Sequence, residues 1–256
     1  MPHFMKKKQF ILICICAVIT ASCTSTVPTR KQNKIAQAIK KEGDVFQARG
    51  NYTAALSKLL EAEKIAPDDP YIQNSLGLAY MGKEKNKMAI QAFNKALALK
   101  PDYTEALNNL GAAYLRDEKW DIAVKTFNKV LEDLTYPTPH YPLANIGWAQ
   151  LAQNNYPAAQ NYFLKAAREV PGFIPAIHGL AQLYIRTDQT DRAMALLDKN
   201  IKRSPDTAIF HADLAQVYEA CGRTPQAINA WQMVTQLSSE NSKLYYRAEQ
   251  RLFELQ

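Results

Sequence analysis

Cysteine, histidine and glycine are scarce in this chain of 256 residues, which has four cysteines, four histidines and nine glycines. Two of the cysteines fall in an apolar run near the N-terminus, so only Cys23 and Cys221 remain outside it. Two cysteines cannot form a disulfide framework or a cysteine-based metal cluster. Cys221 stands among small and apolar residues near the end of an expected helix, and we expect it to be a structural thiol.

The histidines and glycines show no catalytic or ligand-binding arrangement. The sequence contains no Cys/His spacing typical of metal ligands, no glycine-rich phosphate loop and no serine elbow. The four histidines are dispersed, and His211 falls on the core-facing side of its expected helix. We therefore expect no catalytic residue, no metal, no cofactor, no small-molecule substrate and no enzymatic activity.

The positive charge gives little indication of a nucleic-acid partner. The net charge is +7, from 31 basic and 24 acidic residues. Lys6, Lys7 and Lys8 belong to an expected signal peptide, and without them 28 basic residues oppose 24 acidic ones, a net charge of +4. No expected helix combines a dense basic face with interleaved aromatic residues, so nucleic-acid binding is not predicted.

The first 22 residues have the features of an export signal. Lys6 to Lys8 precede an apolar run from Phe10 to Ile19, which is too short to span a membrane. Thr20-Ala21-Ser22-Cys23 then resembles the cleavage box of bacterial lipoproteins, although Thr20 stands where an aliphatic residue is usual. The resemblance implies lipidation of Cys23. The residue after Cys23 is Thr24 and not aspartate, which by the same resemblance implies anchoring at the periplasmic face of the outer membrane. The alternative is an ordinary signal peptide with an incidental cysteine.

Residues 23–35 are polar and basic and contain one proline, so we expect a flexible tether between the lipid and a folded domain. The remainder of the chain, residues 36–241, is built from an internal repeat. Each repeat is anchored by a small residue, and successive anchors are 34, 34, 36, 34 and 34 residues apart: Gly43, Gly77, Gly111, Gly147, Ala181 and Ala215. An aromatic residue follows three places later in five of the six: Phe46, Tyr80, Tyr114, Tyr184 and Tyr218.

Each repeat predicts a pair of helices. In residues 70–103, Leu76 and Tyr80 lie on one face of a first helix, and Ala89, Phe93 and Ala96 on one face of a second. Gly82 and the polar run after it are expected to separate the two helices, and Pro101 to end the second. Neither apolar face can be buried within one pair, so neighbouring pairs must stack.

This pattern resembles the tetratricopeptide repeat. The resemblance implies an all-α fold, a right-handed superhelical solenoid of six repeats at 36–69, 70–103, 104–139, 140–173, 174–207 and 208–241. Residues 242–256 are expected to form a capping helix that covers the last repeat with Leu244, Tyr245, Leu252 and Phe253.

In this fold the first helix of each repeat lines a concave groove, where proteins are bound. The residues that the resemblance places there, and that we select as candidates for partner binding, are Tyr71, Asn74, Asn108, Asn109, Tyr141, Asn145 and Trp148. Asparagine can both donate to and accept from a peptide backbone, and tryptophan and tyrosine are common at binding hot spots. Ordinary surface polarity is the alternative for the asparagines. A carboxylate-binding clamp of the chaperone-binding type is disfavoured, because Asp44 stands where that clamp has asparagine.

One irregularity interrupts the repeats. Three prolines, at positions 137, 139 and 142, flank the start of the fourth unit and are expected to exclude helix there. A tolerated loop insertion and a kink that shapes the groove for a partner are both open.

The order of the parts resembles the type IV pilus pilotins, the PilF/PilW/Tgl group: a lipoprotein cleavage box, a short tether, six repeats, and a break before Asn145-Ile146-Gly147-Trp148-Ala149. The resemblance implies a lipid-anchored scaffold that binds secretin subunits and promotes their localisation and assembly. The alternative is an adaptor for cell-wall hydrolases or for outer-membrane protein assembly, with other envelope proteins as partners.

Overall fold

The computed structural model describes residues 28–255, and the proposed lipidation site Cys23 lies outside them. Thirteen helices and no strand occur in that part of the chain. Their bounds are α1 (Arg30–Ala48), α2 (Tyr52–Ile65), α3 (Pro70–Gly82), α4 (Asn86–Leu99), α5 (Thr104–Arg116), α6 (Trp120–Glu132), α7 (His140–Ala152), α8 (Tyr156–Glu169), α9 (Ile174–Arg186), α10 (Thr190–Arg203), α11 (Ala208–Ala220), α12 (Thr224–Leu237) and α13 (Lys243–Leu255).

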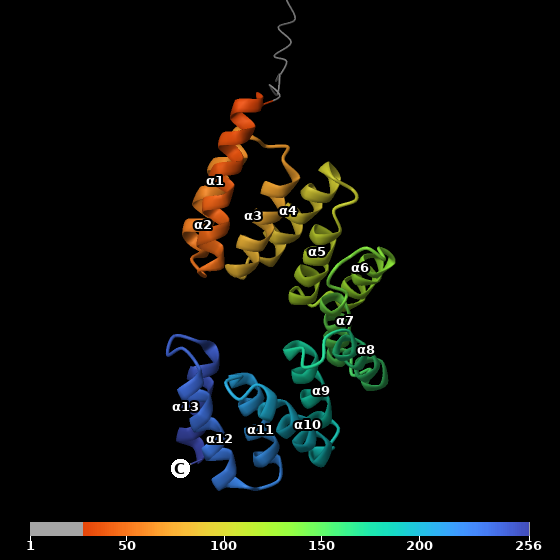
Figure 1. The fold of residues 1–256 in the computed structure, drawn as a ribbon, viewed down its shortest axis with the longest axis vertical. Coiled ribbons are helices and arrows are strands. Elements are labelled where there is room, and N and C mark those ends of the chain that lie inside the picture. Colours follow the sequence, from red (N-terminus) through yellow and green to blue (C-terminus); the bar gives the residue numbers. More distant parts are fainter. Residues whose placement is uncertain (1–27, 256) are drawn as a thin grey trace, which may run out of the picture.

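The helices stack in chain order as pairs along a curved solenoid, with α1 at one end and α13 at the other (Figure 1). Six pairs followed by a single helix confirm the expected all-α architecture. Each odd-numbered helix from α1 to α9 contacts the next odd-numbered helix as well as its own partner. The odd-numbered helices from α1 to α11 therefore form one continuous inner layer, which we call the groove layer.

The small anchor residues allow the two helices of a pair to approach closely. A Cβ atom added to Gly77 in α3 would lie 2.4 Å from the ring of Phe93 in α4, which is fully buried. Phe163 in α8 is held between two helices in the same way, because a Cβ on Gly147 or on Gly179 would lie within 2.6 Å of its ring. The expected close packing is confirmed.

The turn within each pair contains one residue in the left-handed backbone conformation. Gly82 is not this residue, since it ends α3. Its lack of a side chain makes room for Tyr52, because a Cβ atom added to Gly82 would lie 2.2 Å from the Tyr52 ring. The left-handed positions recur with the period of the repeat, with φ between 56° and 72°: Gly50, Glu84, Glu118, Asn154, Asp188 and Gly222.

Three expectations from the sequence require correction. Helix α1 begins at Arg30, so residues 30–35 are helical and do not belong to the tether. Thr29 and Gln32 form a capping box there: the Thr29 backbone N–H donates to Gln32 Oε1 over 2.8 Å, and the Gln32 N–H donates to Thr29 Oγ1 over 3.2 Å. Phe253 does not cover the last repeat, because 85% of its surface is exposed. Cys221 is exposed and follows α11 directly, so it has no role in the core.

The proline-rich break extends only as far as Pro139. Helix α7 begins at His140 and includes Pro142 in its first turn, where backbone N–H groups need no helical acceptor. The prediction that no helix forms before position 142 is therefore wrong for residues 140–142, which are helical. The break occupies residues 133–139, where Asp133 accepts hydrogen bonds from Thr104 Oγ1 and Thr135 Oγ1.

Candidate functional site: the groove layer

Two junctions between consecutive helices of the groove layer are joined by polar side-chain pairs. Asn109 Nδ2 in α5 donates to Asn74 Oδ1 in α3 over 3.0 Å. His178 Nδ1 in α9 lies 2.7 Å from Asp213 Oδ2 in α11. In both cases the partners are 35 residues apart, so they occupy facing positions on adjacent helices. Asn74 and Asp213 are buried, and their polar atoms are occupied by these neighbours.

The equivalent pair between α5 and α7 is not formed. Asn108 and Asn145 occupy these positions, two residues farther apart in sequence because of the insertion before α7. Asn108 Oδ1 is buried and accepts no hydrogen bond from any described residue. The next facing pair, Ala144 and Gly179, has no polar side-chain atoms at all. Polar pairing of this kind is therefore missing on both sides of α7, at the centre of the groove layer. At the first end of the layer the facing residues Lys40 and Ser75 do not pair either, and Lys40 bonds to Asp44 instead.

Trp148 lies one turn after Asn145 and is held rigidly. Its ring packs edge-on against Phe163, with ring centroids 5.4 Å apart. It also packs at a tilt against the imidazole of His178, with ring centroids 5.0 Å apart. The imidazole is fixed on its other side by Asp213, which also accepts from Gln182 Nε2 over 2.8 Å. Trp148 itself is partly exposed, so this part of the layer presents aromatic surface on α7.

Tyr71 and Tyr141 lie on exposed edges of the layer, with 43% and 47% of their surfaces accessible. Tyr71 meets Tyr103 edge-on at 5.2 Å. Burial raises the pKa of Tyr103 to about 12, with Glu105 and Tyr71 nearby adding to the effect. Tyr141 packs against His140 and Phe173.

The predicted candidates thus divide into three groups. Asn74 and Asn109 bond to each other, and Tyr71 and Tyr141 lie on exposed edges. Asn108, Asn145 and Trp148 lie on α5 and α7, the two helices at the centre of the layer. The sequence reading passed over His178, Asp213 and Gln182. Aligning positions 178 and 213 with Asn74 and Asn109 by the repeat period would have identified them as a facing pair.

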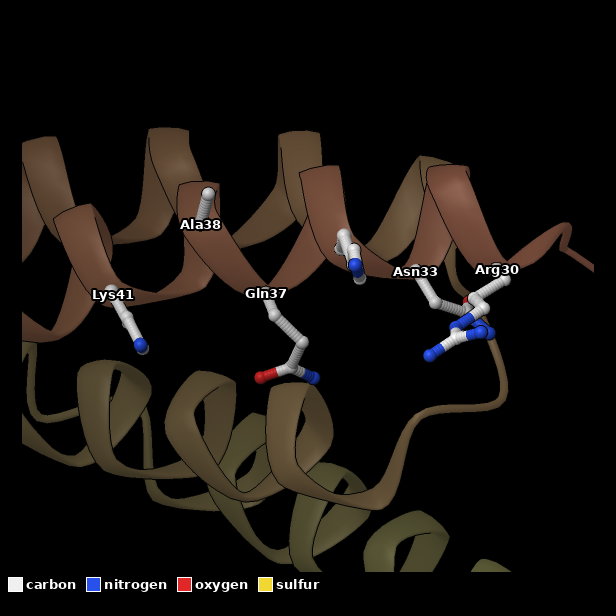
Figure 2. A pocket seen from close by; sticks show the side chains of 6 residues that line it. Arg30, Asn33, Gln37, Ala38 and Lys41 are labelled. Atoms are coloured by element: carbon white, nitrogen blue, oxygen red, sulfur yellow. The ribbon is translucent and has the colours of Figure 1, made fainter.

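At the start of the layer, α1 borders a shallow hollow of about 660 Å³ (Figure 2). It is lined by Arg30, Asn33, Lys34, Gln37, Ala38 and Lys41. Gln37 Nε2 donates to Asp69 Oδ2 over 2.6 Å, which fixes this face of α1 beside the start of α3.

The described residues contain no group of three or more histidine, cysteine, aspartate or glutamate side chains placed to hold a metal ion. Across residues 28–255, no helix combines the length and the apolar character that crossing a membrane requires.

Comparison with known protein families gives matches to two descriptions of the same repeat. A tetratricopeptide-repeat family matches residues 150–212, and a TPR-repeat family matches residues 43–84 and 79–117. A comparison with curated protein sequences gave no significant match.

Among solved structures, PilW, described as a widely conserved type IV pilus biogenesis factor, superposes with a TM-score of 0.71 at 22% identity, over 84% of this chain and 99% of PilW. PilF of Pseudomonas aeruginosa gives 0.65 at 19% identity, over 87% of this chain and all (100%) of PilF. A tetratricopeptide-repeat protein of Parabacteroides merdae gives 0.65 at 18% identity, over 86% of each chain. At these identities the likeness is one of fold.

Proposed function

We propose that this chain, a tetratricopeptide-repeat protein, is an outer-membrane lipoprotein that binds secretin subunits in its groove layer and promotes their localisation and assembly during type IV pilus biogenesis. The fold it shares with PilW and PilF supports the connection to the pilus. The lipoprotein-like box at Cys23 supports the anchor. The proposed mechanism is binding alone.

The observation that carries the binding role is the unpaired Asn108 oxygen at the centre of the layer. A buried acceptor without a donor costs about 1–3 kcal/mol. This oxygen is shielded from solvent, so a partner segment pairs with it only after the Asn108 side chain turns toward the groove. A backbone N–H supplied there by the partner recovers part of that free energy on binding. Asn145 can contribute a second contact of the same kind, since its side chain is only partly buried.

Trp148 supplies the apolar part of the contact. Its ring needs no rearrangement on binding, because Phe163 and His178 already hold it. A preorganised aromatic side chain loses little conformational entropy when a partner covers it. We therefore expect the partner segment to place an apolar side chain on Trp148 while its backbone pairs with Asn108 and Asn145.

Secretin assembly in a strain that lacks the gene tests the function. Without the protein, secretin multimers on unboiled gels, secretin in the outer-membrane fraction and pilus-dependent motility should all be lost. The wild type should restore them, and Cys23→Ala should restore them poorly. Normal multimers and normal motility in the deletion strain would sink the proposal and favour the adaptor role with cell-wall hydrolases or outer-membrane assembly.

Binding by the purified protein tests the site. Asn145→Ala combined with Trp148→Ala should weaken affinity for the secretin at least about tenfold, the loss expected on truncating an interface hot spot. Asn128→Ala is the matched control, because Asn128 is an exposed asparagine on α6, outside the groove layer. Equal affinities for the two variants would place the contact elsewhere on the solenoid.

A further inference from the structure

Helix α1 is longer than every other helix of the groove layer, with 19 residues against 13 in each of the others. The additional residues are at its start, which projects beyond the stacked pairs at one end of the solenoid (Figure 1). Residues 30–35 are all exposed, and Ile35 has 44% of its surface accessible. The capping box at Thr29 fixes where this projection begins.

The projection is strongly basic. Residues 30–41 include Arg30, Lys31, Lys34, Lys40 and Lys41 and no acidic residue. Of the five, only Lys40 forms an ion pair within the described part of the chain, with Asp44 at 2.7 Å. The positive end of the helix dipole adds to the same charge.

The carboxylates that contact this stretch, Asp69 and Asp44, are fewer than its five basic residues. Asp69 is the N-cap residue of α3, and its oxygens accept from the backbone N–H groups of Tyr71 and Ile72 and from Gln37. Asp44 is engaged by Lys40. Arg30, Asn33, Lys34, Gln37 and Lys41 therefore present one polar, positively charged face along more than two turns of α1 (Figure 2).

We infer that this face of α1 binds anionic phospholipid headgroups at the membrane to which the chain is anchored. The inference rests on the lipidation proposed at Cys23. Arg30 is the seventh residue after Cys23, and even a fully extended chain of seven residues spans only about 25 Å. An acylated Cys23 thus keeps the basic start of α1 close to the headgroups at all times.

The position of the basic face favours this occupant over an acidic peptide in the groove, since charge alone would suit either. The exposed first two turns of α1 lie on the side of the chain that leads to the anchor, away from the unpaired centre at Asn108. Each basic residue held near an anionic surface strengthens the association about fivefold. Headgroup contact would hold the first end of the solenoid against the membrane and leave the groove centre accessible to a partner.

Lysine footprinting of the full-length lipidated protein in vesicles tests the inference without any protein partner. An amine-reactive reagent is applied, and modification of each lysine is followed by mass spectrometry. In vesicles that contain phosphatidylglycerol, modification of Lys31 and Lys34 should be at least about threefold slower than in purely zwitterionic vesicles, and this protection should disappear in about 0.5 M salt. Lys199 and Lys202, exposed on α10, are internal controls whose rates should not change.

Variants make the test specific. Arg30→Glu combined with Lys34→Glu should remove the protection of Lys31, whereas Lys199→Glu combined with Lys202→Glu should leave it intact. The thermal unfolding of both variants should match that of the wild type, because the changed residues are exposed. Equal Lys31 rates in the two kinds of vesicle would overturn the inference.

Two other outcomes also overturn it. If inorganic phosphate alone protects Lys31 and Lys34 in zwitterionic vesicles, the face is a site for a free anion. If the purified full-length chain carries no lipid, the geometric premise fails. Since no secretin is present, loss of groove binding would not affect these results, and the two proposals can fail separately.

Discussion

At the scale of single residues, the structure separates polar side chains that hold the solenoid together from those that remain available. Asn74 and Asn109 are satisfied by each other, and Asp213 by His178 and Gln182. Asn108 is also an asparagine and lies at the place in its repeat that Asn74 occupies in the previous repeat, but its buried oxygen has no donor. Residue type alone therefore does not distinguish structural asparagines from binding ones. The distinction depends on whether the residue on the facing helix forms a hydrogen bond with the asparagine.

Tyr103 provides a pH dependence that can be measured. Burial, with Glu105 and Tyr71 nearby, raises its pKa to about 12 from an ordinary value of about 10. The folded state thus favours the neutral phenol, and the stability that this contributes is fully present below pH 10. It is lost as the pH rises from about 10 to about 12.

We expect Tyr103→Phe to reduce the decrease in the free energy of unfolding between pH 9 and pH 12, because the variant has no phenol to ionise at this position. Urea denaturation across this range measures the effect. Tyr246→Phe, at a position with 61% of its surface exposed, is the control for loss of one phenol. Identical pH profiles for Tyr103→Phe and the wild type would contradict the assignment.

At the scale of helices and turns, the left-handed residue within each pair carries a cost that varies from repeat to repeat. Gly50 and Gly222 adopt it freely, but Glu84 and Glu118 carry a Cβ atom, with φ of 59° and 58°. The left-handed conformation costs a residue with a side chain about 1–2 kcal/mol, and the additional chain entropy of glycine offsets about 0.5–1 kcal/mol of that.

Glu118→Gly should therefore stabilise the protein by about 0.5–1 kcal/mol, measured by urea denaturation. Asn154→Gly is the matched comparison at the same place in another repeat, and its gain should be smaller because asparagine tolerates this conformation. A lower stability for Glu118→Gly than for the wild type would show that the glutamate side chain makes a contribution beyond its backbone geometry.

The sequence predicted the structure best at the positions whose packing repeats with the period of the solenoid. The small anchors and their facing rings, such as Gly77 and Phe93, follow directly from spacing. It failed at the ends, where no neighbouring repeat constrains the pattern. The start of α1 is determined by a local capping box at Thr29, and Phe253 extends past the last pair that could bury it. The unpaired centre could not be foreseen, because it depends on which side chains face each other across α5 and α7.

At the scale of the whole molecule, the curvature of the solenoid brings distant parts of the chain together. Lys243 at the start of α13 lies with its Nζ atom 2.5 Å from Oε1 of Glu84, in the turn between α3 and α4, although 159 residues separate them. Figure 1 shows the turn between α3 and α4 and the start of α13 on the same open side of the curved stack. The pair spans the opening between the second repeat and the capping helix.

This contact is weak enough to act as a reversible closure. The two side chains are 90% and 73% exposed, and exposed ion pairs of this kind contribute only about 0.2–1 kcal/mol. A free energy of that size shifts a two-state distribution by at most about fivefold. The solenoid should therefore alternate between a closed and a more open curvature, with the balance set by salt.

Distances between spin labels test this expectation. Labels at Lys83→Cys and Asn241→Cys, both exposed positions, report on the opening in a background where Cys221 is replaced by alanine. We expect a short distance at low ionic strength and a growing population of longer distances at 0.5 M salt, where screening acts within about 4 Å. Lys243→Glu should favour the longer distances even at low salt, and adding Glu84→Lys should restore the short one. A distribution that is unchanged by salt and by both substitutions would show that the packing of the repeats alone fixes the curvature.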